Sequence, residues 1–338
     1  MLQQLYLEVE IPLNLRAFLR LFAHIQLLPV LENGEETTLV GGQAVMEGVM
    51  MRTPHSYCVA VRKPDGEIVA EENPLPRLSE SYPVFKLPVL RGLGTLGHAM
   101  WLGMKALKFS AECALGVRTE AGQSKEQGSG AMVLQILFSL TFMIALYKFV
   151  PLYLATLAGQ HFHAIGSRFA INMVDGTLRI AIFLGFMLLL SRMKDMRRVF
   201  EYHGAEHKVV FNFESGQPVT VANAQRFVTW HPRCGTSFLV VVLIVAMICY
   251  AFLPIDNFWL KLAARIALLP LIVGVSYEAI RFAAKRQRGL MGILTRPGLW
   301  LQRVTTKPPS DPQTEVAIRA LERAMELERL QGGELVIA

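Results

Sequence analysis

Apolar residues gather in four long stretches in the middle of the chain, and few charged residues interrupt them. The stretches cover about residues 131–157, 174–191, 237–254 and 262–280. A membrane-spanning helix needs about 20 apolar residues, so the first and third stretches are long enough, whereas the second is short. The fourth contains Arg265 and Pro270. This pattern predicts an α-helical polytopic membrane protein with about four transmembrane helices.

The part before these stretches has a different pattern. Residues 1–37 predict an amphipathic helix and a linker, and residues 38–88 form a β-rich segment. Within that segment, residues 57–62 are expected to face residues 67–71 across a turn at Pro64, Asp65 and Gly66. Because proline pre-sets a turn and glycine accepts a positive φ, the spacing predicts a β-hairpin.

One amphipathic helix is expected before the apolar stretches and another after them. Residues 89–117 are small and apolar but carry interspersed basic residues, which favours an interfacial helix. In the C-terminal tail, 281–338, residues 312–330 repeat apolar positions at helical spacing against Glu and Arg. This second helix is expected to dock on the cytosolic part.

Basic residues near the ends of the apolar stretches indicate the orientation, because Lys and Arg next to spans stay in the cytosol. The loops near 158–173 and 255–261 carry only Arg168 and Lys261. The basic residues that follow the second and fourth stretches are Arg192, Lys194, Arg197 and Arg198, then Arg281, Lys285, Arg286 and Arg288. The pattern predicts cytosolic termini and a cytosolic loop over residues 192–236.

Composition supports this interpretation. The chain of 338 residues is 52% hydrophobic and 18% charged, with a formal net charge of +7. The basic residues flank apolar stretches and lack interleaved aromatics, so they favour membrane lipids rather than nucleic acid as partners. The four cysteines lie far apart, which argues against a disulfide framework. The sequence leaves the oligomeric state open, a homo-oligomer included.

The strongest chemical signal is the His-x-x-Glu-His pattern of His203, Glu206 and His207. On a helix, residues four apart share a face at about 5–6 Å between Cβ atoms, so both imidazoles can reach one cation. Glu206 would then lie beside them as a general base. The alternative is a helix-end cluster in which Glu206 pairs with Lys208 or an upstream arginine.

A second group ends the same loop and includes His231 and Cys234. Imidazole and thiolate are ligands that zinc accepts readily. Binding by His203, His207 and Cys234 alone would leave a position open for catalysis, whereas binding by His231 as well would close a structural site. Cys234 as a nucleophile with His231 as its base is a weaker alternative.

Two acidic residues need partners. Glu47 lies among apolar residues, where Arg52 is the nearest candidate for an ion pair. Glu278 follows the fourth stretch and is expected to pair with Arg281 or Arg198. It is also the first choice if the metal needs an acidic ligand.

Four longer motifs carry a resemblance to a known family. The motifs span residues 41–52 (GGQAVMEGVMMR), 202–208 (YHGAEHK), 231–237 (HPRCGTS) and 297–303 (PGLWLQR). In this order they resemble the YqhQ-like family of bacterial membrane proteins of unknown function, which are described as predicted metal-dependent enzymes. The resemblance covers roughly residues 38–325. It implies a multi-pass protein of the bacterial inner membrane and a bound metal, but no substrate.

The sequence therefore leads to two functional hypotheses. The first is a metal-dependent membrane enzyme, hydrolytic in type, that holds a divalent ion such as zinc on its cytosolic side. The second is a non-enzymatic transport or assembly protein with a structural metal site. In that case Asp175, Arg179 and Arg265 would line a polar path, because ionisable groups in spans are costly and tend to be functional.

Overall fold

The computed structural model describes residues 40–75, 82–114, 129–231, 234–285 and 290–330. The predicted N-terminal helix and linker, residues 1–37, lie outside these ranges. So do Arg286 and Arg288 and the last eight residues of the tail.

The β-rich segment is a four-stranded antiparallel meander in the order β1-β2-β3-β4. Its strands are β1 (Gly41–Val45), β2 (Gly48–Arg52), β3 (Ser56–Arg62) and β4 (Ile68–Pro74). The antiparallel sheet confirms the predicted hairpin, with Arg62 paired to Ile68 and Gly66 at φ 92° in the turn. The segment 41–52 adds a second hairpin, which turns at Glu47 with φ 54°.

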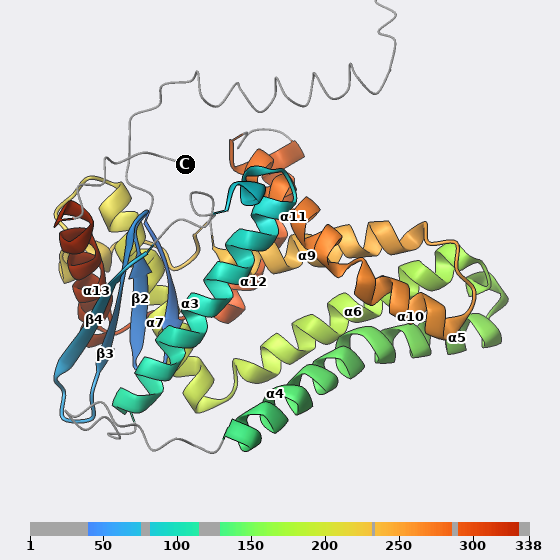
Figure 1. The fold of residues 1–338 in the computed structure, drawn as a ribbon, viewed down its shortest axis with the longest axis horizontal. Helices are drawn as coiled ribbons and strands as arrows, with labels where there is room; N and C mark the ends of the chain where they lie inside the picture. Colours follow the sequence, from blue (N-terminus) through green and yellow to red (C-terminus); the bar gives the residue numbers. More distant parts are fainter. Residues whose placement is uncertain (1–39, 76–81, 115–128, 232–233, 286–289, 331–338) are drawn as a thin grey trace, which may run out of the picture. The chain divides into compact units, whose positions relative to one another are not determined.

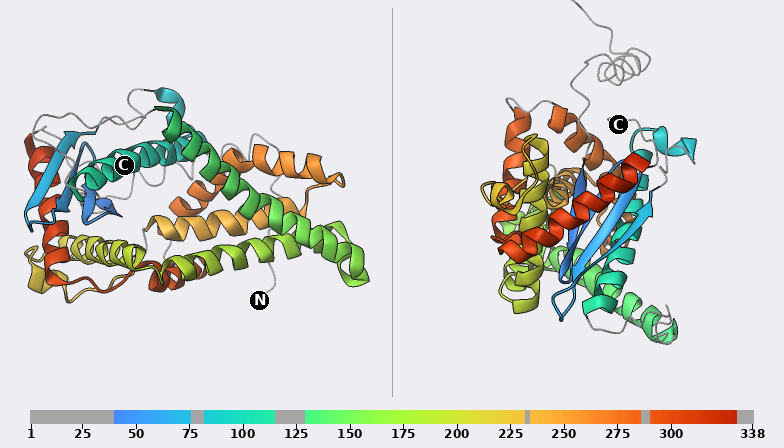
Figure 2. Two further views of the ribbon diagram at one scale, coloured as in Figure 1. Left: turned by 90° about the horizontal axis from the view of Figure 1, so that it is seen from below. Right: turned by 90° about the vertical axis from the view of Figure 1, so that its left-hand side faces the viewer.

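Helices cover both faces of this sheet (Figures 1 and 2). One face, which includes Val49 and Ala60, packs on α7 (Lys194–Glu214) and α13 (Asp311–Leu330). The other face, which includes Met50 and Val59, packs on α3 (Leu90–Ala114). The alternation follows from the two-residue period of a strand, which sends successive side chains to opposite faces.

Three segments with a sequence prediction pack as helices against the sheet. The helix expected at the membrane interface, α3, buries Leu102, Ala106 and Phe109 against the sheet and leaves Trp101 and Met104 exposed. The predicted loop 192–236 is largely the helix α7 with the short α8 (Val221–Ala224). In the tail, α13 buries Val316, Ala320, Leu321 and Ala324 as part of the core.

The remaining helices form an apolar bundle. Its members are α4 (Ser129–Ile144), the π-helical turn η2 (Ala145–Phe149), α5 (Val150–His161), α6 (Arg168–Leu190), α9 (Gly235–Ala251), α10 (Phe258–Ala267) and α11 (Leu269–Lys285). Gly176 lets α6 approach α9, because a Cβ there would lie 2.3 Å from Met247 Cγ. The helix α12 (Leu290–Thr305) packs on α9, and two 3₁₀ turns, η1 (Pro83–Lys86) and η3 (His163–Ile165), complete the described chain.

Within the described chain, two helical segments are long and apolar enough to cross a membrane, Leu137–His161 and Arg168–Leu190. The pair α10 and α11, bent by 46°, adds a third if it forms one span. The helix α9 is apolar but has only 17 residues. The structure is therefore mostly helical with two or three candidate spans, and the expected total of four stays a prediction.

Candidate metal centre

The helix α7 carries three of the predicted site residues on its inner side. His203 lies next to Thr305 at the end of α12, Glu206 next to Gly42 of β1, and His207 next to Thr229. Gly204 permits this packing, because a Cβ there would lie 2.0 Å from the carbonyl oxygen of Lys307. Lys307 in turn donates its backbone N–H to the carbonyl of Phe200 at 2.8 Å. The glycine in the motif therefore brings residues 305–307 against α7.

Both histidines are oriented by backbone carbonyls. His203 Nδ1 lies 2.8 Å from the oxygen of Thr305, and His207 Nδ1 lies 2.5 Å from that of Thr229. Because a carbonyl oxygen only accepts, Nδ1 is the donor in each ring, which leaves Nε2 as the nitrogen that can accept or bind a metal. Metal-binding histidines are commonly fixed in this way.

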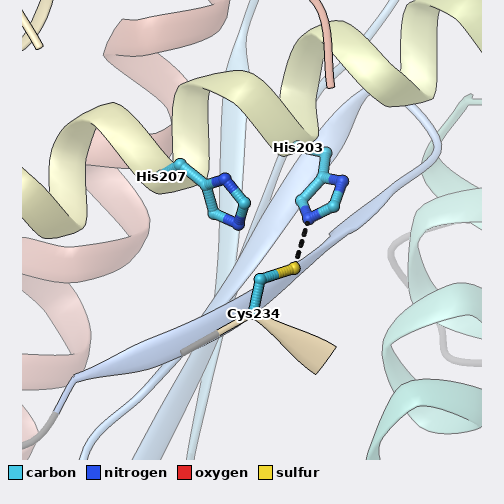
Figure 3. A group of neighbouring side chains, drawn as sticks. All are labelled: His203, His207 and Cys234. Carbon is cyan, nitrogen blue, oxygen red and sulfur yellow. Dashed lines mark hydrogen bonds between the residues drawn. The ribbon is translucent and has the colours of Figure 1, made fainter. Parts of the chain in front are cut away.

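Cys234 completes the group from the N-cap of α9 (Figure 3). Its Sγ lies 3.3 Å from His203 Nε2 and 3.2 Å from the hydroxyl of Thr236. One ligand atom from each of His203, His207 and Cys234 lies within 4.8 Å of the others. Among the described residues, His207 Nε2 has no hydrogen-bond partner although the side chain is 2% exposed.

Burial sets the protonation of the group. It lowers the pKa of His207 to about 2, with the neighbouring His203 adding to the effect, and it lowers the pKa of His231 to about 4. Both rings are therefore neutral near pH 7, the form that binds metals. The pKa of the Cys234 thiol is raised, because the effect of burial exceeds that of the hydrogen bonds with Thr236, which lower it.

Glu206 is a buried carboxyl next to this group. It is 6% exposed, its Oε2 lies 4.0 Å from His203 Nε2, and the backbone N–H of Gly42 donates to it. Burial raises its pKa to about 7. The predicted pairing with Lys208 is not present, since Lys208 Nζ donates to the carbonyls of Gln225 and Phe227. Glu206 thus faces the histidines and strand β1.

The other two predicted ligands lie outside the group of three. The backbone of His231 is held by Gln302 through two hydrogen bonds of 2.6 and 2.9 Å. The His231 ring lies 5.7 Å from that of His207, and its Nε2 lies 3.4 Å from Glu214 Oε2. Glu278 pairs with Arg91 of α3 rather than with Arg281 or Arg198.

Several contributors to the site were not predicted. They include the carbonyls of Thr229 and Thr305, the N–H of Gly42 and the amide of Gln302. Only Gly42 and Gln302 belong to the motifs that the sequence singled out. The expected partner of Glu47 was wrong: its carboxylate pairs with Arg198, with Nη2 to Oε2 at 2.6 Å, instead of with Arg52.

Comparison with known proteins assigns the chain to a protein family. A family model described as "Protein of unknown function (DUF1385)" matches residues 87–327. The "Uncharacterized protein YqhQ" of Bacillus subtilis (strain 168) is 37% identical over 300 residues, which cover 86% of this chain and 93% of that protein. No solved structure matches the chain. The chain belongs to the DUF1385 family of YqhQ-like proteins, the family that its four motifs resemble.

Proposed function

We propose that this protein is a metal-dependent hydrolase of a bacterial inner membrane, with His203, His207 and Cys234 as the ligands of a zinc ion. The observation that carries the proposal is the buried His207 Nε2, which has no hydrogen-bond partner among the described residues and lies in one group with His203 and the Cys234 thiol. A buried acceptor without a donor is costly, and a cation relieves that cost.

The donor set suits zinc. Two imidazole nitrogens and one thiolate are typical zinc ligands, whereas magnesium and calcium prefer oxygen ligands. Ligands of a tetrahedral zinc lie about 3.3–3.8 Å apart, given bond lengths of about 2.0–2.3 Å. The ligand atoms here lie within 4.8 Å of one another, so their spacing exceeds that range by no more than about 1.5 Å.

Glu206 supports a hydrolytic role. Three protein ligands leave one tetrahedral position open, as in catalytic zinc sites. Zinc in such a site lowers the pKa of water toward neutrality. Glu206, with Oε2 4.0 Å from His203 Nε2 and a pKa of about 7, is placed to accept a proton and to return it to a leaving group.

The surface of the bundle supports insertion into a membrane. In the segments Leu137–His161 and Arg168–Leu190, only 17% and 22% of the most apolar window is buried inside the protein. Phe138, Leu140 and Leu189 are among the exposed apolar side chains. Such a large apolar surface is unusual for a protein in water. We infer four spans, with α9 and the pair α10 and α11 as the other two, and cytosolic termini.

The test uses full-length protein purified in detergent and loaded with zinc. Glu206→Gln should keep one zinc per chain and lose at least about 100-fold in the hydrolysis of whichever ester, phosphoester or peptide the wild type cleaves. Glu201→Gln, on the same helix but hydrogen-bonded to Gln313, is the matched control and should keep wild-type activity. An active Glu206→Gln enzyme would remove Glu206 from the reaction.

A second candidate rests on the position of His231. In this alternative its side chain, whose ring lies 5.7 Å from that of His207, moves to bind the ion as a fourth ligand. Four protein ligands make a closed, structural site. The protein would then be a non-enzymatic transport or assembly component. In that case His231→Ala weakens zinc binding as strongly as His203→Ala, whereas the enzyme proposal predicts a much smaller effect.

A further inference from the structure

A second group of buried polar side chains lies inside the apolar bundle, apart from the candidate metal centre. Each of its members is at most 8% exposed. The members come from η2, α6, α9 and α10 and are Lys148, Asn172, Asp175, Arg179, Tyr250 and Arg265.

The contacts within this group converge on one oxygen atom. Asp175 Oδ2 accepts from Arg179 Nη2 at 2.7 Å and lies 2.9 Å from Arg265 Nη1. Arg265 Nη2 donates to Asn172 Oδ1 at 2.7 Å, and Arg179 Nε donates to the carbonyl of Tyr147 at 3.0 Å. In the described part of the chain, Arg179 Nη1 and Arg265 Nε find no acceptor, and Asp175 Oδ1 finds no donor. Two buried guanidiniums therefore have N–H groups to spare.

The charges in the group do not balance. Among the described residues, Lys148, Arg179 and Arg265 interact with one carboxylate, that of Asp175, and Lys261 beyond them is within range of both Arg265 and Asp256. Arginine stays protonated in proteins, so a positive charge is in excess even when Lys148 is neutral. The three cationic groups lie 5.0–5.1 Å from the centre of the Tyr250 ring. This cation–π attraction is weak beside the cost of burying an ion.

The backbone around the group is irregular in two places. Lys148 and Tyr147 lie in the π-helical turn η2, and Arg265 lies near the end of α10, where the chain bends by 46° into α11. Single π-turns in helices are frequent at functional sites. Broken helices within membrane bundles commonly surround ligand-binding sites.

We propose that this group is a binding site for a phosphate-type oxyanion, either a phosphate or a phosphodiester. Arg179 Nη1 and Arg265 Nε donate to the anion, which neutralises the excess positive charge. Guanidinium groups suit this task because their planar N–H forks match the oxygens of carboxylates and phosphates. The source is either a lipid headgroup or a small anion in solution. The proposal stands independently of the zinc site.

The test uses the full-length protein in nanodiscs of phosphatidylcholine. Equilibrium dialysis with radiolabelled inorganic phosphate measures a soluble anion. Native mass spectrometry after purification from phosphatidylglycerol-containing membranes counts tightly held anionic lipid. Arg179→Gln and Arg265→Gln remove the proposed donors. Arg168→Gln is the matched control, since Arg168 is an exposed residue of α6 that pairs with Asp256.

We expect one of the two measurements to show one saturable site per chain. Either donor variant should weaken the affinity of that site at least tenfold, and Arg168→Gln should leave the affinity unchanged. Saturable phosphate binding identifies a soluble anion, and retained phosphatidylglycerol that phosphate does not displace identifies a lipid. The absence of both in the wild type, or binding that the donor variants leave unchanged, overturns the proposal.

Asp175→Asn tests the same site in the opposite direction, by a gain of binding instead of a loss. This change removes the negative charge that repels an anion bound beside both guanidiniums. We expect anion binding about tenfold tighter than in the wild type, a change of about 1.4 kcal/mol. Weaker binding by folded Asp175→Asn protein would contradict an anion site, because removing a nearby negative charge should strengthen the binding of an anion.

Discussion

The candidate metal centre and the charged group in the bundle both bury ionisable side chains, but they differ in the atoms that lack hydrogen-bond partners. Beside α7 the unpartnered atom among the described residues is an acceptor, His207 Nε2, and the rings of His207 and His231 are neutral near pH 7. In the described part of the bundle, the unpartnered N–H groups of Arg179 and Arg265 outnumber the unpartnered acceptor, Asp175 Oδ1. An orphan acceptor next to a thiol calls for a cation, and spare guanidinium donors call for an anion. The hydrogen bonds that a buried site lacks thus indicate the charge of its ligand.

The largest effect is expected in the bundle. Asp175→Asn leaves two buried guanidiniums without their counter-charge, and breaking a buried pair in this way costs about 3–5 kcal/mol of stability. Thermal unfolding in nanodiscs measures it, and phosphate should raise the midpoint of the variant more than that of the wild type. Asp256→Asn breaks an exposed pair with Arg168 and should cost about 0–1 kcal/mol. Equal effects of the two changes would show that the Asp175 ion pairs are not truly buried.

A smaller effect is expected where α7 meets residues 305–307. Gly204→Ala places a methyl group against the Lys307 carbonyl and displaces Thr305, which orients His203. Overpacking of this kind costs about 1–3 kcal/mol, and zinc affinity should fall with it. Denaturant unfolding and a zinc titration measure the two quantities.

Gly235→Ala is the control for this substitution. Gly235 adjoins Cys234, yet nothing lies within 4 Å of a Cβ added there. If both alanine variants lose zinc equally, the close approach at Gly204 does not support the site.

The smallest effect concerns Glu328 of α13, which anchors that helix beneath the sheet. Burial raises the pKa of its carboxyl, but hydrogen bonds from Thr53 and His55 outweigh burial, so the pKa is lowered from 4.5. A carboxyl whose pKa is lower in the folded state stabilises the fold at pH values above its pKa in the unfolded chain. That stabilisation is lost as the pH falls through the folded-state pKa. Glu328→Gln should therefore cost about 1–2 kcal/mol at pH 7 and progressively less below pH 4.5. A cost independent of pH would assign the effect to packing.

Local features of the structure were predictable from the sequence. The spacing of His203 and His207 indicated one helical face, and Pro64, Asp65 and Gly66 indicated the turn between β3 and β4. Both depend on residues a few positions apart, where backbone geometry alone decides which side chains meet.

Contacts between distant segments could not be predicted in the same way. Glu278 meets Arg91, 187 residues away, and Glu47 meets Arg198, 151 residues away. The sequence gives the charges, but the packing of α3 on α11 and of β1 on α7 decides the partners. Carbonyl groups such as those of Thr229 and Thr305 leave no signal in the sequence, because every residue has one.

The most direct test of the account is X-ray absorption at the zinc edge on the full-length protein, with His207→Ala and Cys234→Ala beside the wild type. We predict one zinc per chain, with two nitrogen ligands at about 2.0–2.1 Å, one sulfur at about 2.3 Å and one further oxygen. The sulfur should disappear in Cys234→Ala, and His207→Ala should lose most of the metal. A wild-type protein that binds no zinc, or binds it without sulfur, would contradict the proposed centre.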